Sequence, residues 1–344
     1  MSINNFETRI QTGVPLAVHT TFKIGGPADF FLAVKNHLDL KTAIIWAKGR
    51  HLPIFVLGGG SNLLIADNGF RGLVLKNEIR GIKFTENSDK TVTIEIGSGE
   101  NWDDFVALSL ARNYFGLENL SGIPGTVGGS AVQNAGAYGA ELKDFVVSVS
   151  GINIQSGRTF NFSKSDCAYS YRDSIFKKNK KLCITSVTLK LPRTFIPNLS
   201  YAGLSENFAQ DKAVTAEMIR QYILQMRAEK LPDWKQIGTA GSFFKNPIIT
   251  EKKYQALLIK YPNLPSFSFK PGLVKIPLGF VLDKICDLKG YKIGPVGLYE
   301  KQALVLVNLG GATANDVKKV SDFVKNIILE KLGIKIEEEV ESVF

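Results

Sequence analysis

The sequence contains few of the residues on which several enzyme classes depend. Its 344 residues include three cysteines and three histidines. Cys167, Cys183 and Cys286 form no CxxC pair, which argues against both a disulfide framework and a zinc site. The histidines all lie within the first 51 residues, and none stands at metal-ligand spacing from another. Ser-His-Asp and Cys-His catalysis are therefore disfavoured, unless one of these histidines reaches across the fold.

Long apolar runs and low-complexity tracts are also missing. No apolar run approaches the roughly 20 residues that a helix needs to cross a bilayer. The first residues, MSINNFETRIQTG, lack the basic-then-apolar layout of a signal peptide. The composition is 44% hydrophobic and 22% charged, which suffices for the cores of two or three lobes. We expect a cytoplasmic protein without a membrane partner.

The chain carries an excess of positive charge, with a formal net charge of +10. Such an excess serves solubility in many proteins, and it also suits nucleic acids or small phosphorylated ligands. No run of five or six basic residues occurs, and the densest group is FKKNKK at 176–181. The pattern favours phosphates on small molecules over a nucleic-acid groove.

Strand and helix patterns alternate irregularly, without the steady rhythm of a parallel α/β fold, so we predict an α+β or mixed α/β class. Strands are expected at 54–57, 72–77, 91–99, 145–154, 183–191, 303–309 and 334–344. Helices are expected at 101–113 (capped by Asn101), 215–230, 277–294 and 313–333. In the 215–230 helix one apolar face is expected, formed by Met218, Ile219, Tyr222, Ile223 and Met226.

Two glycine-rich stretches are candidate ligand loops. The first, Gly58-Gly59-Gly60-Ser61-Asn62, follows a buried-strand pattern, and successive glycines allow backbone N–H groups to converge on an anion. It is neither a P-loop nor a Rossmann fingerprint, because GK[ST] and G-x-G-x-x-G are both missing. The second, SGIPGTVGGSAVQNAGAYGAE at 121–141, interleaves glycines with apolar residues and few charges. Its backbone is expected to lie close against a flat or phosphorylated group. Together the two loops suit a dinucleotide such as FAD.

Longer ordered motifs carry a family resemblance. VLGGGSNLL, GSGENWDDFV, ENLSGIPGTVGGSAVQNAGAYGAE and YSYRDSIFK resemble UDP-N-acetylenolpyruvylglucosamine reductases, which make UDP-N-acetylmuramate for the bacterial cell wall. AGSFFKNP, LKGYKIGPVGLYEKQALVLVN and the acidic C-terminal segment extend the likeness over nearly the whole chain. The resemblance implies an α+β fold with a split, two-lobe FAD-binding region of the PCMH/vanillyl-alcohol-oxidase type and a smaller α/β substrate lobe. The implied lobes are 1–78 (completed by 334–344), 79–231 and 232–333.

The resemblance also implies a reaction. NADPH reduces non-covalent FAD, and hydride then passes from flavin N5 to C3 of the enolpyruvyl ether of a UDP-sugar. Arg172 and Glu339 stabilise the enolate-like charge, Arg172 through its guanidinium and Glu339 by hydrogen bonding. Ser242 gives the proton to C2. A carbanionic carbon is basic enough to take a proton from a weak acid, so this serine needs no histidine.

The resemblance assigns further residues to the two ligands, and it assigns none to a metal. The cofactor-binding set is Gly58, Gly59, Gly60, Ser61, Asn62, Ser121, Gly122, Ile123, Pro124, Gly125, Thr126, Gly128, Gly129, Asn134, Gly136, Ala137 and Tyr138. The substrate-binding set is Tyr171, Tyr201, Arg227, Lys230, Asn246 and Gln302. Tyr201 resembles the tyrosine loop that closes over substrate in the longer type of this enzyme, although it also fits an ordinary exposed loop. By helical position, Lys230 is expected to point partly inward and Arg227 to turn further toward solvent.

Two of the catalytic assignments have rivals in the sequence. Arg172 alone would also fit an ordinary residue of a surface strand. In an extended C-terminal segment, Ile336, Glu338 and Val340 would share one face, and Glu337 and Glu339 the other. The family's usual ending has a proline before the catalytic glutamate and an arginine two residues after it, where this chain has Glu338 and Glu341. The register selects Glu339, and Glu337 remains an alternative.

Two other functions stay open at this point. One is a different oxidoreductase on the same FAD fold, such as an oxidase that uses O₂. The other is a non-catalytic basic protein that binds nucleotides or RNA. For the reductase we expect a monomer whose partners are a UDP-sugar and NADPH, with no nucleic acid.

Overall fold

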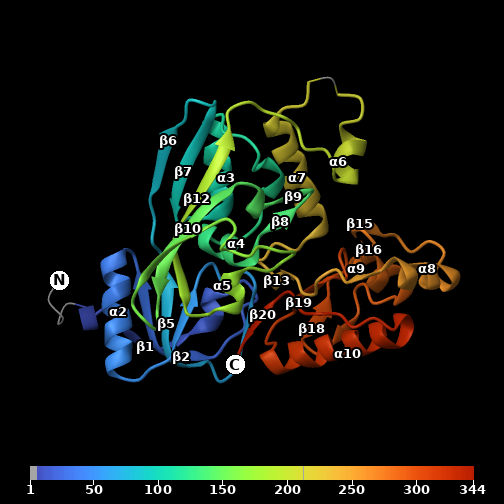
Figure 1. The fold of residues 1–344 in the computed structure, drawn as a ribbon. Helices are drawn as coiled ribbons and strands as arrows, with labels where there is room; N and C mark the ends of the chain where they lie inside the picture. The colour runs from blue at the N-terminus through green and yellow to red at the C-terminus, as the bar shows by residue number, and fades with distance from the viewer. Residues whose placement is uncertain (1–5, 212) are drawn as a thin grey trace. The chain divides into compact units, whose positions relative to one another are not determined.

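The computed structural model describes residues 6–211 and 213–344, which form two compact units (Figure 1). Unit 1 contains the described residues up to Val14, Ala28–Gly59 and Arg71–Arg227. Unit 2 contains Pro15–Pro27, Gly60–Phe70 and Ala228–Phe344. The expected α+β class is confirmed, and the three-lobe division at 1–78, 79–231 and 232–333 stays a prediction.

The first sheet of unit 1 has four strands in the order β1 (Gln11–Pro15), β2 (Pro27–Val34), β5 (Phe70–Asn77) and β3 (Ile54–Leu57). Helix α2 (His37–Gly49) packs its Leu40, Ala43 and Ile44 against Leu32 and Leu73 of the sheet. Strands β3 and β5 run parallel, with Leu57 opposite Lys76. The register therefore brings Lys76 to the point where β3 ends and the first glycine loop begins.

The second sheet of unit 1 is antiparallel, in the order β11 (Thr159–Ser163), β10 (Val146–Asn153), β12 (Leu182–Pro192), β7 (Thr91–Gly97) and β6 (Ile82–Glu86). Helices α3 (Trp102–Ala111) and α4 (Val127–Gln133) pack against it. The predicted start of α3 is confirmed, because the Asn101 side chain accepts a hydrogen bond from Asp104 N. Trp102, Phe105 and Val106 form its buried face.

The remaining elements of unit 1 are short, except for α7. They are η2 (Glu118–Leu120), β8 (Gly136–Ala137), β9 (Ala140–Glu141), η3 (Leu142–Asp144), α5 (Ile175–Lys178), α6 (Ala202–Asn207) and α7 (Ala216–Lys230), whose last residues belong to unit 2. The expected face of α7 is partly wrong. Ile219, Ile223 and Met226 are buried against α6, whereas Met218 is exposed and Tyr222 is half-buried. Leu204 and Phe208, in and beside α6, pack against the face of α7 that contains Ile219, and Met218 is left exposed to solvent.

Unit 2 contains three small sheets. Their orders are β13 (Gly238–Ser242), β19 (Val305–Asn308), β18 (Val296–Leu298), β17 (Lys292–Ile293); then β14 (Ile248–Thr250), β16 (Leu273–Lys275), β15 (Phe267–Lys270); and the parallel pair β20 (Glu341–Val343) and β4 (Leu63–Ile65). Its helices are η1 (Leu16–His19), α8 (Glu251–Lys260), α9 (Leu278–Phe280), the π-helical turn η4 (Val281–Ile285) and α10 (Ala314–Leu332).

Helix α10 confirms the helix predicted at 313–333. Thr313 and Asp316 form a capping box at its start, and Gly333 ends it with φ of 60°. Val317, Val320, Val324 and Ile328 are fully buried in the core of unit 2.

Two predicted elements of unit 2 are shorter than expected. The 277–294 segment forms only α9 and η4, and Asp287 then takes φ of 54°, which ends the helical path. The 334–344 segment is a paired strand only at β20. It changes partner on the way, because Glu338 bridges to Phe244 and Glu341–Val343 pairs with Leu63–Ile65.

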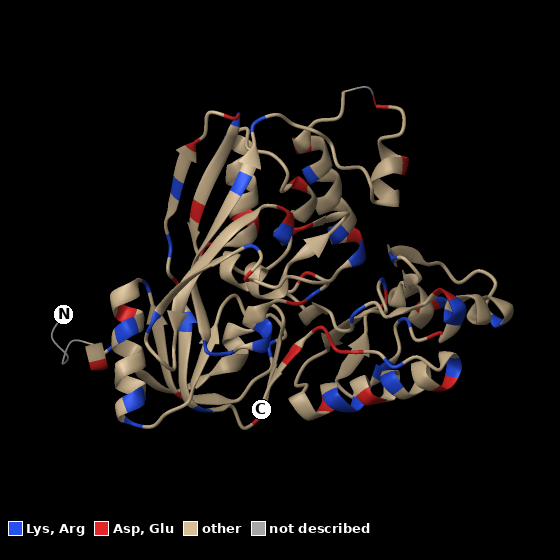
Figure 2. Cartoon of the chain, in the orientation of Figure 1, with Lys and Arg blue, Asp and Glu red and all other residues tan. Residues whose placement is uncertain are grey.

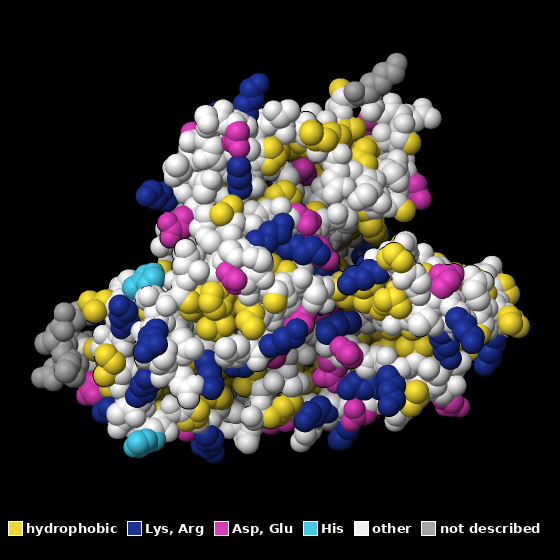
Figure 3. Space-filling model, viewed as in Figure 1, with side chains coloured by type: hydrophobic (Ala, Val, Ile, Leu, Met, Phe, Trp, Pro, Cys, Tyr) yellow, Lys and Arg dark blue, Asp and Glu magenta, His cyan; other side chains and the backbone are white. Residues whose placement is uncertain are grey.

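Among the described residues, no helix is long and apolar enough to cross a membrane. Charged residues of both signs alternate along α10 (Figure 2). On the face drawn in Figure 3, Lys and Arg stand in small groups separated by acidic, apolar and uncharged surface. The net charge of +10 is therefore not gathered there into the continuous basic stripe typical of a nucleic-acid groove.

Candidate active site

The two glycine loops predicted to bind a cofactor touch one another within unit 1. Gly58 and Gly59 follow β3 directly. A Cβ atom on Gly59 would lie 2.5 Å from the Cα atom of Gly125, closer than any real side chain is found. A Cβ atom on Gly58 would lie 3.0 Å from Oγ1 of Thr126. The close approach of two backbones, which only glycine permits, explains why both loops lack side chains here.

The second loop is threaded between β7, α3 and α4 by backbone hydrogen bonds. Trp102 N donates to Gly125 O at 3.1 Å, and Gly128 N donates to Ser98 O at 2.9 Å. Thr126 caps α4, because its Oγ1 accepts from Gly129 N at 3.2 Å. Ile123 and Ala137 are partly buried and pack against the hydrophobic core beneath the second sheet, which holds the loop in place.

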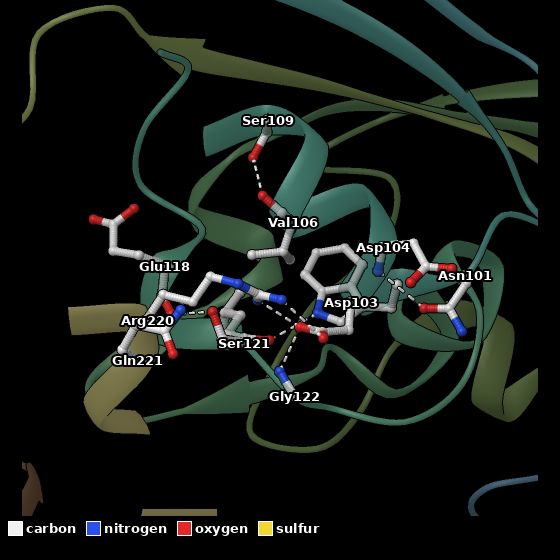
Figure 4. A network of polar contacts seen from close by, with 12 residues as sticks. Asn101, Asp103, Asp104, Val106, Ser109, Glu118, Ser121, Gly122, Arg220 and Gln221 are labelled. Carbon is white, nitrogen blue, oxygen red and sulfur yellow. Dashed lines mark hydrogen bonds and ion pairs between the residues drawn. The ribbon is translucent and has the colours of Figure 1, made fainter. Parts of the chain in front are cut away.

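A network of polar contacts holds the start of this loop (Figure 4). Asp103, in the first turn of α3, accepts from Gly122 N at 2.6 Å. The same carboxylate receives a bidentate pair from Arg220 of α7, at 2.7 and 3.0 Å. Burial of Asp103 raises its pKa, but the hydrogen bonds from Arg220 and Gly122 outweigh that effect and hold the pKa below its ordinary value. Asp103 thereby ties the loop to two helices.

Ser121 and Glu118 complete this end of the loop. Ser121 is buried, and its hydroxyl donates to Glu118 O at 2.6 Å. The Glu118 carboxylate accepts from Gly116 N at 2.7 Å and is nearly fully buried. Burial raises the pKa of Glu118, although backbone N–H groups partly oppose the rise. Ser121 therefore uses its hydroxyl within the protein.

Asn134 ends α4 in the left-handed conformation, with φ of 47°. Its amide donates to Glu141 Oε2 at 3.0 Å and to Ser170 O at 2.9 Å, and its Oδ1 accepts from Lys143 N at 3.0 Å. All of these partners are protein groups. Asn134, predicted to bind the cofactor, thus positions the loop at 170–174 that carries Arg172.

Arg172 lies in a tight turn rather than in a strand, with φ of 54° and a bridge between Ser170 and Asp173 on either side. Its Nη2 donates to Gly136 O at 2.5 Å, and its guanidinium carbon lies 5.3 Å from the centroid of the Tyr171 ring. The structure brings Arg172 and Tyr171 to the predicted cofactor residue Gly136. The alternative that Arg172 is a residue of a surface strand is wrong.

Two further side chains fasten the same turn to α4. Ser174 Oγ donates to Val132 O at 2.6 Å. Lys177 Nζ donates to Gln133 Oε1 at 2.8 Å and to Arg172 O at 3.4 Å. The left-handed conformation of Arg172 is therefore held by Ser174, by Lys177 of α5 and by Gln133 of α4.

Tyr138 and Tyr201 meet edge to face, with ring centroids 5.1 Å apart and an angle of 88° between the rings. Burial raises the pKa of the Tyr138 phenol, while the neighbouring Arg227 guanidinium opposes the rise. Burial likewise lowers the pKa of Arg227, and Tyr138 opposes that effect. Tyr138, Tyr201 and Arg227 therefore lie together in unit 1.

The expected orientations of two basic residues on α7 are reversed. Arg227 is half-buried, and its Cδ and Nε atoms would lie 3.0 Å from a Cβ atom on Gly122. Lys230, at the last position of α7, is exposed. Arg227 faces inward because its side chain packs against Tyr138 and the loop at Gly122. The apolar pattern of the helix does not reveal these partners, because they lie far away in the sequence.

In unit 2, the end of the first glycine loop serves the C-terminal segment. Thr21 N donates to Gly60 O at 3.0 Å, and Ser61 follows in a turn. The Asn62 amide donates to Glu339 O at 3.1 Å, and Asn62 O accepts from Glu341 N at 3.0 Å. Asn62 therefore positions the segment of Glu339, a role that its predicted assignment to the cofactor did not include.

The Ser242 and Glu339 segments run side by side in unit 2. Ser242 ends β13, opposite Val305 of β19. Glu339 N donates to Phe243 O at 2.8 Å, and Lys245 N donates to Glu337 O at 2.9 Å. Two predicted catalytic residues far apart in the sequence are thus held in register by backbone pairing.

The three consecutive glutamates differ in what surrounds them. Glu337 is 76% exposed and pairs with Lys245 at 3.0 Å. Glu338 turns toward α10, where it accepts from Ser321 Oγ at 2.6 Å and pairs with Lys325. Glu339 is half-buried beside Phe243. That Glu337 and Glu339 share one face stays a prediction, and Glu339 is the more enclosed of the two rival carboxylates.

Asn246 and Gln302, both predicted to contact substrate, lie in unit 2 near α9. Asn246 Oδ1 accepts from Leu278 N at 2.9 Å. Gln302 Oε1 accepts from Leu304 N at 3.3 Å and would lie 2.6 Å from a Cβ atom on Gly279. Phe243 N in turn donates to Leu304 O at 2.8 Å, which links Gln302 to the Ser242 strand.

Sequence reasoning missed three residues that support the predicted site. Asp103 and Arg220 form an ion pair across more than 100 residues, and no local pattern announces it. Lys76 did leave a signal, because it follows the apolar run Leu73-Val74-Leu75 in a buried strand. A lysine at such a place requires a partner. In the described part of the chain, no group of three His, Cys, Asp or Glu side chains could hold a metal ion.

Comparison with known proteins defines the class. A family model described as an FAD binding domain matches residues 28–163, which contain both glycine loops. With the α+β fold, the match makes the chain an FAD-dependent oxidoreductase. A second model, described as the C-terminal domain of UDP-N-acetylenolpyruvoylglucosamine reductase, matches residues 232–343.

Individual relatives give the family. The chain is 41% identical over 328 residues to UDP-N-acetylenolpyruvoylglucosamine reductase of Bacteroides fragilis (strain YCH46), covering 94% of this chain and 97% of the relative. It is 40% identical over 338 residues to the reductase of Bdellovibrio bacteriovorus, covering 96% and 98%. The crystal structure of the reductase from Thermus caldophilus aligns with a TM-score of 0.68 at 26% identity, covering 97% and 98%. The chain belongs to the UDP-N-acetylenolpyruvoylglucosamine reductase family.

Proposed function

We propose that this protein reduces the enolpyruvyl group of UDP-N-acetylglucosamine enolpyruvate to a lactyl ether, with NADPH as the electron donor. The product, UDP-N-acetylmuramate, is a precursor of peptidoglycan. The proposal is supported by the family match over 94% of the chain. The observation that carries it is the backbone pairing of the Ser242 and Glu339 segments. The family match favours this reaction over an oxidase and over a nucleotide- or RNA-binding protein.

The glycine loops fit a flavin dinucleotide. A Cβ atom on Gly59 or Gly122 would meet other protein atoms within 3.0 Å, so the loops must stay bare of side chains. Bare backbone presents its N–H groups to an anion such as the FAD diphosphate. We assign to the cofactor the loop residues 58–61, 121–126, 128–129 and 136–138. We give Asn62 and Asn134 the supporting roles that their hydrogen bonds describe. When bound, FAD supplies the hydride that reduces C3 of the enolpyruvyl group.

Three side chains act on the substrate in this proposal. As the C=C bond is reduced, negative charge develops at C2 and on the adjoining carboxylate. Arg172 stabilises it with its guanidinium, and Glu339 stabilises it by hydrogen bonding. Ser242 donates its proton to C2, which completes the saturated lactyl carbon. The bare backbone of Gly241, with φ of 74°, keeps the approach to Ser242 open.

The remaining substrate contacts are proposed for Tyr171, Tyr201, Arg227, Lys230, Asn246 and Gln302. Arg227 and Lys230 have positive charge suited to a sugar diphosphate. Asn246 and Gln302 each use their amide oxygen on a backbone N–H, and their amide NH₂ groups can donate to ligand oxygens. We also propose that residues 1–78 with 334–344, 79–231 and 232–333 act as two FAD-binding lobes and a substrate lobe. The pairing of β20 with β4 supports the return of the C-terminal segment to the first lobe.

The proposed enzyme works in the cytoplasm as a monomer, with a UDP-sugar and NADPH as its partners and with neither nucleic acid nor membrane. The grouping of Lys and Arg described above supports this choice over an RNA-binding protein.

Absorbance and turnover test the proposal together. The purified protein should be yellow, and denaturation should release FAD, because no histidine lies in the 121–141 stretch to form a covalent link. NADPH oxidation should depend on the enolpyruvyl sugar nucleotide and should produce no peroxide. A colourless protein that binds no added FAD would contradict the flavoenzyme, and peroxide formation without substrate would favour the oxidase.

A further inference from the structure

Lys76 lies beneath the first glycine loop of unit 1. It occupies β5, opposite Leu57 of the parallel strand β3, between the buried residues Leu75 and Asn77. Its Nζ donates to Gly58 O at 2.5 Å. Burial lowers the pKa of its ammonium, and the nearby Glu78 carboxylate opposes that effect. The end of a core strand thus carries a positive charge directly to the loop.

Lys76 is a charged residue in a largely apolar part of its strand. Leu73, Val74 and Leu75 of the same strand are fully buried, and Lys76 itself is half-buried near the Glu78 carboxylate. Placing an ammonium in such surroundings costs free energy unless it is hydrogen-bonded. Within the described chain, Gly58 O is the one hydrogen-bond acceptor recorded for this ammonium. Its contact with the loop is therefore what the lysine contributes.

That contact fixes the orientation of one peptide group. A trans peptide is planar, and its C=O and N–H bonds point in opposite directions. Because Lys76 holds the carbonyl of Gly58, the N–H of Gly59 must point away from Lys76. Among the described residues, no acceptor is recorded for the Gly59 N–H, and the Cα atom of Gly125 leaves that backbone no room for a side chain. An N–H donor held this way is suited to an anionic oxygen.

We propose that Lys76 is a positioning residue for the cofactor diphosphate. It orients the Gly58–Gly59 peptide so that the Gly59 N–H donates to a phosphate oxygen, and its charge adds attraction from behind the loop. The inference rests on the proposed assignment of this loop to FAD. It predicts that the lysine affects ligands that carry the diphosphate and leaves the bare isoalloxazine unaffected.

The test compares FAD with riboflavin, which lacks phosphate, as ligands of the apoprotein. Lys76→Met removes the ammonium and keeps a side chain of similar length. It should weaken FAD binding about tenfold, the scale of one lost charge-assisted hydrogen bond. Riboflavin binding should stay within about twofold, so the ratio of the two dissociation constants changes. Lys83→Met, on the exposed face of β6 in the same unit, is the matched control and should leave both constants unchanged.

Lys76→Gln provides a second variant if the methionine protein does not fold. Its amide ends one bond short of the position of Nζ, and the same selective loss of FAD affinity is expected. Equal weakening of FAD and riboflavin, or unchanged FAD binding in either folded variant, would overturn the role of Lys76. If the wild-type protein binds no FAD at all, the proposed function fails instead, and the two failures are thereby distinguished.

Discussion

The loop of Arg172 and the segment of Ser242 are held in place by different kinds of contact. Around Arg172, the side chains of Asn134 and Ser174 donate to backbone carbonyls, and Lys177 donates to the Gln133 side chain. Around Ser242, the contacts are backbone pairings with Val305 and with the Glu337–Glu339 segment. The first arrangement depends on particular side chains, whereas the second depends on strand register. Substitution of a supporting side chain should therefore lower turnover more around Arg172 than around Ser242.

The largest effect is expected for substitution of Ser242 itself. The backbone pairing would keep the segment in place, but the proton donor would be lost. Ser242→Ala should leave flavin reduction by NADPH near the wild-type rate, since that half-reaction needs no proton at C2. Reoxidation of the flavin by substrate should fall at least about a hundredfold, the usual scale for losing a general acid. Stopped-flow absorbance of the flavin measures both half-reactions. Normal reoxidation in Ser242→Ala would show that another group donates the proton.

A comparison of Glu339 with Glu337 tests which carboxylate is catalytic. The position within the family's C-terminal motif selects Glu339. Glu339→Gln should slow reoxidation about thirtyfold, since it keeps a hydrogen-bonding side chain but loses the carboxyl group. Glu337→Gln should stay within about twofold, because Glu337 is 76% exposed and pairs only at the surface. Impairment of the second variant alone would move the catalytic role by two residues.

The dependence on side chains can be broken at Asn134. Asn134→Gly keeps the left-handed backbone and removes the amide that donates to Ser170 O. Turnover should fall about tenfold, because the turn that presents Arg172 becomes looser. Lys245→Met is the counterpart in the other segment. It removes only an ion pair with the exposed Glu337, so turnover should change less than about twofold. Equal effects of the two variants would refute the contrast.

The smallest effect concerns stability and its dependence on pH. Asp103→Asn keeps an acceptor for Gly122 N and loses the charge opposite Arg220, which should cost about 2 kcal/mol of unfolding free energy near pH 7. Because the folded-state pKa of Asp103 is lowered, its contribution is present above the unfolded-state pKa and is lost as pH falls through the folded-state pKa. Denaturant titrations should therefore show the gap between wild type and variant closing below about pH 4. A gap independent of pH would exclude the ion pair as its source.

Much of the fold could be predicted from local patterns, because caps and buried stripes act over a few residues. Asn101, Thr313 and Gly333 each marked a helix end that the structure confirms. The glycine loops were also recognisable, because bare backbone has a distinctive composition. Patterns of this kind do not depend on distant partners.

Predictions failed where a distant partner decides the outcome. Arg227 is drawn inward by Tyr138, and the stripe of its own helix does not contain that information. The sequence also contains no sign that the Asn62 amide donates to Glu339 O, 277 residues away, while the assignment of Asn62 to the cofactor stays a prediction. The C-terminal segment was expected as one strand, but it changes partner from Phe244 to β4, which follows from topology and not from alternation.

The contact between Gly59 and Gly125 limits how this protein can change. In most crowded places a harmful enlargement can be compensated by trimming the neighbour. Here the nearest atom to an added methyl on Gly59 is the Cα atom of another glycine, which has no side chain to remove. No substitution at position 125 can therefore remove the clash that a larger residue at position 59 would create. Random mutagenesis with selection for cofactor retention should recover neither Gly59→Ala nor any double variant that contains it.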